Sequence, residues 1–240
     1  MATTHTVKSF DDDLRQLRSY ISQMGGLAEA QIMGAIEALA SRNPEMAMRI
    51  VTGDRAIDHL EMEAERHIIQ TIARRQPLAD DLREVISALK IAALIERIGD
   101  YAKNIAKRAT ALAQVSPIQP VVIVPEMGKL VARMVKDVLD AYASRDAELA
   151  RTVWSRDKHV DDFYASLFRA LLTYMMENPQ QITPSTHVLF IAKNLERIGD
   201  HATNIAEIVH FNVTGEYMEP DRPKGDETAF SVHGMESDED

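Results

Sequence analysis

The 240-residue sequence contains no cysteine, so it offers neither a disulfide framework nor a thiolate metal site. Aromatic residues make up only 5% of the chain, with a single tryptophan. The sequence has no apolar run of about 18 residues that could cross a membrane as a helix. The first residues also lack the basic run and apolar segment of a secretory signal. These absences exclude soft-metal chemistry, and we expect a soluble, cytoplasmic protein.

Basic charge is also scarce, because 37 acidic residues outnumber 27 lysines and arginines and leave a formal net charge of −10. Sequence-independent binding of nucleic acid needs clustered basic residues to neutralise phosphates. We therefore expect no nucleic-acid partner, and proteins or cations instead. Hydrophobic residues make up 45% of the chain, which is enough for a substantial core.

Apolar residues recur at spacings of three and four, as in Ile32, Ala35, Ile36 and Leu39, and helix-forming residues dominate. The pattern predicts an all-α protein. Breaks come at Asn43-Pro44, around Gln76-Pro77, at 116–125 and at 178–184. The helices are expected at about 7–41, 44–75, 79–114, 126–144, 147–177 and 181–211.

The sequence is internally duplicated. Adding 103 to a residue number maps Met24 onto Met127 and Asp54 onto Asp157, and the offset falls to 100 in the last helix of each half. One small insertion in a duplicated unit explains both offsets. We predict two tandem three-helix bundles at 7–115 and 126–212, a linker at 116–125 and a disordered acidic tail at 213–240.

Carboxylates recur in matching positions of the two halves. Glu, Asp and Asn follow one another at intervals of four residues in the third helix of each bundle, and two aspartates four residues apart lie in each second helix. Residues four apart share a helix face. The antiparallel second and third helices place these pairs at similar heights, so four carboxylates can converge in each bundle. The predicted sites consist of Asp54, Asp58, Glu96 and Asp100 in the first half and Asp157, Asp161, Glu196 and Asp200 in the second.

Four carboxylates in one place repel each other unless a cation or protons neutralise them. A hard, oxygen-preferring ion suits such a site: Mg²⁺, Mn²⁺, Ca²⁺ or ferric iron, with Zn²⁺ as a further candidate. Asn104 and Asn204 could supply a carbonyl ligand or a hydrogen bond to a ligand. Gly99 and Gly199 precede the aspartates and would let a helix or the ions approach closely.

Two other interpretations of the carboxylates stay open at this point. Acidic residues four apart are common on solvated helix faces, where Arg97 or Arg197 could pair with them in surface salt bridges. Without metal, the carboxylates could form an acidic face for basic partner surfaces. The sequence offers little for catalysis: it has no Gly-rich phosphate loop, no nucleophile with an adjacent base and no Glu-x-x-His. We expect no enzyme, and a metal-dependent phosphatase or oxidase is the weaker alternative.

The segment Glu96-Arg97-Ile98-Gly99-Asp100 with Asn104-Ile105, and its copy from Glu196 to Ile205, resembles the PhoU family of bacterial phosphate regulators. The resemblance covers residues 7–212 and implies two three-helix bundles that bind metal ions or multinuclear metal clusters on the bundle surface, through the eight carboxylates named above. It further implies a cytoplasmic, often dimeric adaptor that represses high-affinity phosphate uptake and the phosphate-starvation response. The implied partners are the ATPase of the phosphate ABC transporter and the phosphate-sensing histidine kinase, so that any membrane contact is indirect.

Overall fold

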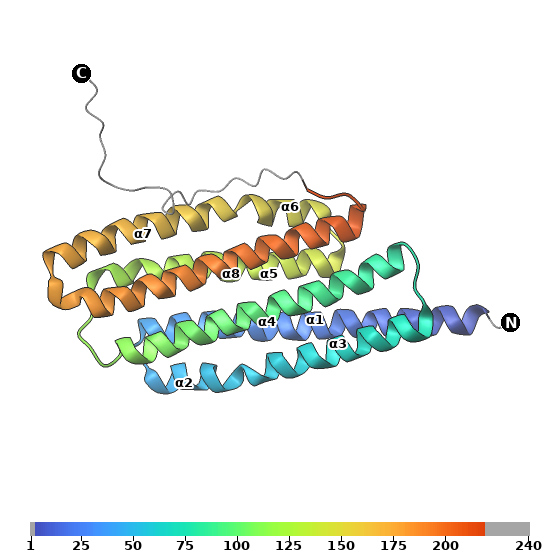
Figure 1. Cartoon of the computed structure of the whole chain (residues 1–240), viewed down its shortest axis with the longest axis horizontal. Helices are drawn as coiled ribbons and strands as arrows, with labels where there is room; N and C mark the ends of the chain where they lie inside the picture. Colours follow the sequence, from blue (N-terminus) through green and yellow to red (C-terminus); the bar gives the residue numbers. More distant parts are fainter. Residues whose placement is uncertain (1–2, 219–240) are drawn as a thin grey trace, which may run out of the picture.

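The computed structural model describes residues 3–218, which form helices and turns and contain no strand, so the all-α prediction is confirmed. The elements are α1 (Thr3–Ala40), α2 (Pro44–Gly53), α3 (Arg55–Arg75), α4 (Asp80–Leu112), η1 (Gln119–Ile123), α5 (Val124–Ser144), α6 (Ala147–Ser155), α7 (Asp157–Glu177), η2 (Pro179–Gln181) and α8 (Ile182–Thr214). They build two three-helix bundles, in which α2 with α3 and α6 with α7 each form one interrupted helix (Figure 1). Among the described residues, no helix is long and apolar enough to cross a membrane.

Matching turns join the first two helices of each bundle, as the duplication predicts. Arg42 and Arg145 both adopt left-handed backbone conformations, with φ of 54° and 56°. The next helix is then capped by a side chain: Asn43 accepts from the amide of Met46, and Asp146 accepts from the amides of two residues that follow it. Such caps satisfy amides that the first helical turn leaves without a partner.

The second helix of each bundle is interrupted. The prediction that the helices at 44–75 and 147–177 are continuous is therefore wrong. The chain turns at Asp54 and at Arg156 before the helix resumes. Gly53 and Asp54 have low helix propensity, and a short Asp side chain competes for backbone hydrogen bonds. The carbonyl of Asp54 accepts from the amide of Ile57 at 2.9 Å, which tightens the turn.

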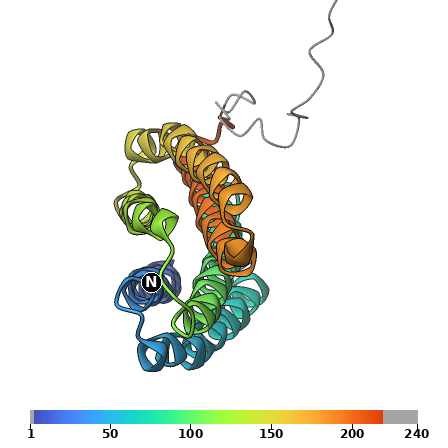
Figure 2. The same cartoon turned by 90° about the vertical axis from the view of Figure 1, so that its left-hand side faces the viewer.

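The two bundles pack side by side, mainly through α4 against α8 and α1 against α5 (Figures 1 and 2). Helices α1, α4, α5 and α8 form the shared interior, while α2, α3, α6 and α7 lie on the outer sides. Buried apolar side chains from both halves form one continuous core, including Ile95 and Leu195 at the centre of α4 and α8. The segment predicted as a linker, 116–125, therefore connects two halves that share a core. This segment contains η1 and the start of α5.

Helices α4 and α8 run antiparallel, because Arg83 near the start of α4 donates to the carbonyl of Asn212 near the end of α8. Their midpoints meet at Tyr101 and His201, whose rings stack with centroids 5.4 Å apart. These residues occupy equivalent positions in the duplication, so a pseudo-two-fold axis passes between them. The helix α8 ends at Thr214 and is capped by Gly215 at a φ of 78°. Of the acidic tail expected at 213–240, residues 219–240 lie outside the described residues.

Candidate functional site: an acidic cluster in each bundle

The first cluster forms where the break between α2 and α3 faces the middle of α4. Asp54 at the break is 2% exposed, and the ammonium group of Lys103 donates to it and, at 2.8 Å, to Asp100 Oδ1. These hydrogen bonds, to Asp100 first and to Asp54, raise the pKa of Lys103. The structure thus brings together the predicted pairs Asp54/Asp58 and Glu96/Asp100. It adds Lys103, which the sequence analysis missed although the residue follows Asp100 by one helical turn.

One lysine does not neutralise this cluster. Burial raises the pKa of Glu96 to about 7, and the charges of Asp100 and Glu61 contribute. Burial likewise raises the pKa of Asp58, and the negative charge of Asp54 raises it further. The pKa of Glu61 is raised by its burial and by neighbouring carboxylates including Asp58, so Glu61 joins the predicted residues at this site. Arg97, the alternative surface partner, lies 3.7 Å from Glu96 Oε2 with a largely exposed side chain.

Gly99 explains how α4 comes close to α3 at this cluster. A Cβ atom at Gly99 would lie 2.9 Å from Ile57 Cδ1, too close for an unstrained contact. The same point would be 3.3 Å from Gln31 Oε1 and 3.4 Å from Asp54 Oδ1. Gln31 is 6% exposed, and its Oε1 finds no hydrogen-bond donor among the described residues. The glycine serves helix packing, and oxygens of Gln31 and Asp54 both lie close to the space that a side chain at this position would fill.

The second cluster is more deeply buried. Asp157 and Asp161 at the start of α7 are 2% and 4% exposed, and Glu196 on α8 is 7% exposed. Burial raises the pKa of Glu196, Lys193 lowers it through a 2.7 Å hydrogen bond to Oε1, and Asp200 and Asp161 raise it. Glu196 thus lies near Asp161 and Asp200, and Asp157 precedes Asp161 by about one turn on α7.

The lysines of the two clusters come from different positions of the repeat. Lys103 corresponds to Thr203, whose hydroxyl donates to the carbonyl of Asp200 at 2.7 Å, and Lys193 corresponds to Ala93. Glu196 Oε2 is fully buried, and in residues 3–218 no hydrogen-bond donor reaches it. Each cluster therefore contains one buried oxygen that its lysine leaves without a partner.

The structure does not yet present a closed ligand shell. Within residues 3–218, no group of three or more His, Asp or Glu side chains is arranged to hold a metal ion. In the first cluster Lys103 lies between Asp54 and Asp100. Asn104 lines a cleft between α4 and α8, described below, and Asn204 is partly buried on α8. Their role as metal ligands or as partners of ligands stays a prediction.

The fold and these clusters define a class: duplicated three-helix-bundle proteins that carry one acidic cluster in each bundle. A protein-family model described as the PhoU domain matches residues 21–109 and again residues 124–209. The chain therefore belongs to the PhoU family, as the paired motifs indicated.

Relatives and solved structures agree with this assignment. A phosphate-specific transport system accessory protein PhoU homolog of Zymomonas mobilis is 54% identical over 221 residues, covering 92% of this chain and 93% of the relative. One from Caulobacter vibrioides is 51% identical over 93% of this chain and 98% of the relative. The crystal structure of PhoU from Pseudomonas aeruginosa superposes with a TM-score of 0.84 at 40% identity, covering 86% of this chain and all of that one. The phosphate transport system regulatory protein PhoU of Streptococcus pneumoniae gives a TM-score of 0.81 at 30% identity, over 88% of this chain and 99% of that one.

Proposed function

We propose that this protein is a cytoplasmic, metal-binding adaptor that represses high-affinity phosphate uptake and the phosphate-starvation response. Its relatives are named as accessory and regulatory proteins of phosphate transport, which supports the phosphate-linked role. The family resemblance points to a homodimer that contacts the ATPase of the phosphate ABC transporter and the phosphate-sensing histidine kinase. The proposal includes no catalytic step.

The observation that carries metal binding is the buried Glu196 Oε2, which no hydrogen-bond donor in residues 3–218 reaches although Asp161 and Asp200 lie nearby. Leaving such an atom without a partner costs free energy, and a second charge nearby adds to the cost. A hard cation supplies the missing positive charge and accepts oxygen ligands. The donor set therefore fits Mg²⁺, Mn²⁺, Ca²⁺ or iron.

The residues that would hold an ion in the second bundle are Asp157, Asp161, Glu196 and Asp200. In the first bundle they are Asp54, Asp58, Glu96 and Asp100. Lys103 competes with a cation there, because its ammonium group already binds Asp54 and Asp100. In the second bundle Lys193 already donates to Glu196 Oε1, so a cation displaces a lysine contact at either site.

Calorimetric titration of chelator-stripped protein with Mn²⁺ tests the metal sites. The double variant Glu196→Gln/Asp200→Asn should lose the binding of the second bundle while its far-UV circular dichroism stays unchanged. The single variant Lys103→Thr, which installs the residue of the second copy, should tighten binding in the first bundle. The matched control is Glu126→Gln, because Glu126 is an exposed carboxylate that pairs with Lys129 in the same way at the surface. Unchanged Mn²⁺ stoichiometry in the double variant would reject the second site.

The adaptor role is tested by capture of the purified transporter ATPase and sensor kinase with and without bound metal. We expect binding to weaken in the Glu196→Gln/Asp200→Asn variant. The alternative is an unmetallated acidic scaffold for basic partner surfaces. In that case capture of the two partners should survive exhaustive chelation unchanged. Light scattering of the purified protein checks the proposed dimer.

A further inference from the structure

A second candidate site lies between the end of α4 and the start of α8 and borders the second acidic cluster, with which it shares Lys193. It is a cleft of about 530 Å³ whose lining includes Lys107, Arg108, Lys193 and Arg197, together with His187, Phe190 and two asparagines. Among residues 3–218, no carboxylate lines it. Four cationic side chains around one cleft are unexpected in a chain whose formal net charge is −10.

Aromatic rings, rather than carboxylates, hold the two guanidinium groups of this cleft. Arg108 lies 4.2 Å from the centroid of Phe190, and Arg197 lies 5.7 Å from that of Tyr101. Across residues 3–218, Lys107, Arg108 and Arg197 form no ion pair, whereas Lys193 donates to Glu196. In a protein with an excess of acidic residues, cations that lack acidic partners and share one cleft are available to an external anion.

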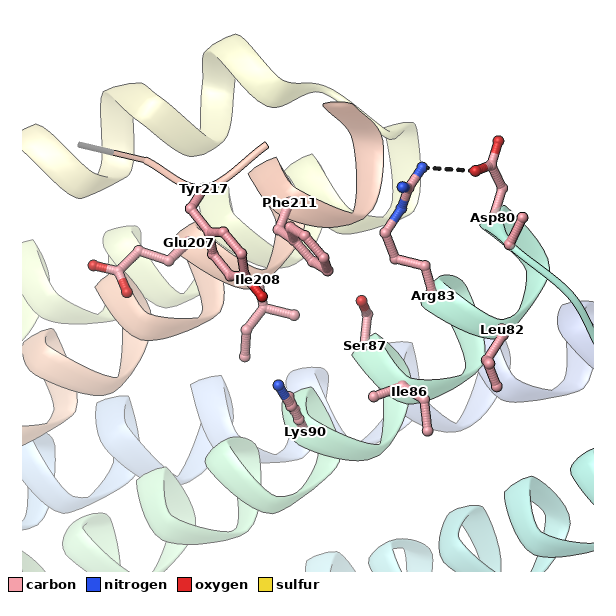
Figure 3. A pocket seen from close by; sticks show the side chains of 11 residues that line it. Asp80, Leu82, Arg83, Ile86, Ser87, Lys90, Glu207, Ile208, Phe211 and Tyr217 are labelled. Carbon is pink, nitrogen blue, oxygen red and sulfur yellow. Dashed lines mark hydrogen bonds and ion pairs between the residues drawn. The ribbon is translucent and has the colours of Figure 1, made fainter. Parts of the chain in front are cut away.

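The duplication supplies an internal comparison, because the pseudo-two-fold axis places a counterpart cleft at the other end of the α4 and α8 contact (Figure 3). Positions that line both clefts differ in charge: Lys107 corresponds to Glu207, and Arg108 corresponds to Ile208. In the counterpart, Arg83 is paired with Asp80 at 3.0 Å.

The lining of the counterpart therefore has two cations, Arg83 and Lys90, and two carboxylates, Asp80 and Glu207, and its formal charge is balanced. Lys193 also has an uncharged twin, Ala93. The groove itself follows from the fold and occurs in both copies. Its basic lining occurs in one copy only, so helix packing does not account for it.

We propose that the basic cleft between α4 and α8 binds the phosphate group of a small molecule. Guanidinium groups bind phosphate oxygens through paired hydrogen bonds, and ammonium groups add point charges. The side chains of Asn104 and Asn194 line the same cleft and can donate to further oxygens. Of the four cationic side chains of the cleft, only Lys193 also pairs with a carboxylate within residues 3–218, through Glu196 of the second cluster.

The test uses the full chain, stripped of metal and exchanged into low-salt buffer, and calorimetric titration with inorganic phosphate, ADP and adenosine. At least one of the two phosphate-bearing probes should bind, adenosine should not, and added salt should weaken binding. Binding of inorganic phosphate identifies the free ion as sufficient. Binding of ADP without phosphate assigns the cleft to nucleotide phosphates.

The double variant Lys107→Glu/Arg108→Ile installs the residues of the counterpart cleft, which the other copy of the same fold accommodates. It should weaken binding by about 100-fold, since each charged hydrogen-bond donor is worth roughly a factor of ten or more. The milder Lys107→Gln, at an exposed position, should weaken binding by about ten-fold. Lys90→Ala in the counterpart cleft is the matched control and should bind as wild type. Failure of both phosphate-bearing probes to bind, or equal binding by the wild type and the double variant, overturns the proposal.

Discussion

At the scale of single residues, two buried or partly buried glutamates on α4 show how differently this fold treats one side chain. Glu84 is 5% exposed, and both its oxygens are occupied: Arg18 of α1 and Arg145 after α5 donate to it at 2.6 and 2.7 Å. Glu96, about three helical turns further along α4, has carboxylates as neighbours. The largely exposed Arg97 lies 3.7 Å from its Oε2. The first glutamate joins three elements, while the second carries a charge that the folded protein does not compensate.

Glu96→Gln is expected to stabilise the metal-free protein at alkaline pH. The folded state raises the pKa of Glu96 from 4.5 to about 7 and so binds a proton more tightly than the unfolded chain. Stability associated with this group is present below the unfolded pKa and is lost as pH rises through 7. At pH 8 the variant should be more stable by roughly 1 kcal/mol, after allowance for solvent screening. At pH 4 the two proteins should match. Urea unfolding with a chelator present measures both, and a variant less stable at pH 8 would contradict the prediction.

Glu84→Gln is expected to have the opposite effect. After the substitution two arginines keep their charge but lose the carboxylate charge, and one of the two acceptor oxygens becomes an amide donor; loss of one partner of a buried ion pair is strongly destabilising. Because the arginine side chains are 39% and 42% exposed, solvent limits the cost to about 2 kcal/mol. The measurement is the free energy of unfolding at pH 7, with exposed Glu126→Gln as the control. A cost no larger than that of the control would show that the bridge adds nothing.

At the scale of helices, the order of the six predicted helices and the matched turns could be predicted from the sequence because periodicity and capping are local properties. Asn43-Pro44 and the repeat offset carry that information within a few residues. The breaks at Asp54 and Arg156 were missed because the apolar pattern continues through them. Lys103 and Gln31 were missed as parts of the first cluster because their relation to Asp54 depends on how α1, α3 and α4 approach one another, which no single segment encodes.

Gly99→Ala and Gly199→Ala are expected to differ, although the motif around them is the same. Alanine gains about 1 kcal/mol of helix propensity at either position. At Gly99 its methyl group would meet Ile57 Cδ1 at 2.9 Å, and overpacking costs about 1 to 3 kcal/mol. At Gly199 the nearest contact is Val160 Cγ1 at 3.3 Å. We expect a net loss of stability for Gly99→Ala and little change or a gain for Gly199→Ala.

The second half also suggests a rescue for Gly99→Ala. Val160 occupies the position that Ile57 has in the first half, and it lacks the δ-methyl group. Ile57→Val should therefore cost less in the Gly99→Ala background than in wild type. Thermal unfolding of the four proteins of this cycle measures the coupling. Additive effects would place the strain elsewhere, at Gln31 or Asp54.

At the scale of the whole molecule, the duplication has produced one protein with two unlike halves. The stacked pair Tyr101 and His201 marks the pseudo-two-fold axis, and most of the residues buried on α4 and α8 are apolar on both sides of it. The surfaces away from the axis have diverged in the positions of their lysines and in the charge of their clefts. Shared burial keeps the two halves together, and the divergence of polar positions gives each half its own chemistry.

The shared core predicts that the two halves unfold as one unit, and the single tryptophan tests this. Trp154 lies on α6, in the second half, where its indole donates to Glu207. Ile68 lies on α3, an outer helix of the first half, and is 1% exposed. Ile68→Ala should destabilise the protein by about 3 kcal/mol through the cavity it leaves. If the halves are coupled, the urea midpoint from Trp154 fluorescence shifts downward together with that from far-UV circular dichroism. A fluorescence transition that stays in place while the circular dichroism becomes biphasic would show that the halves unfold separately.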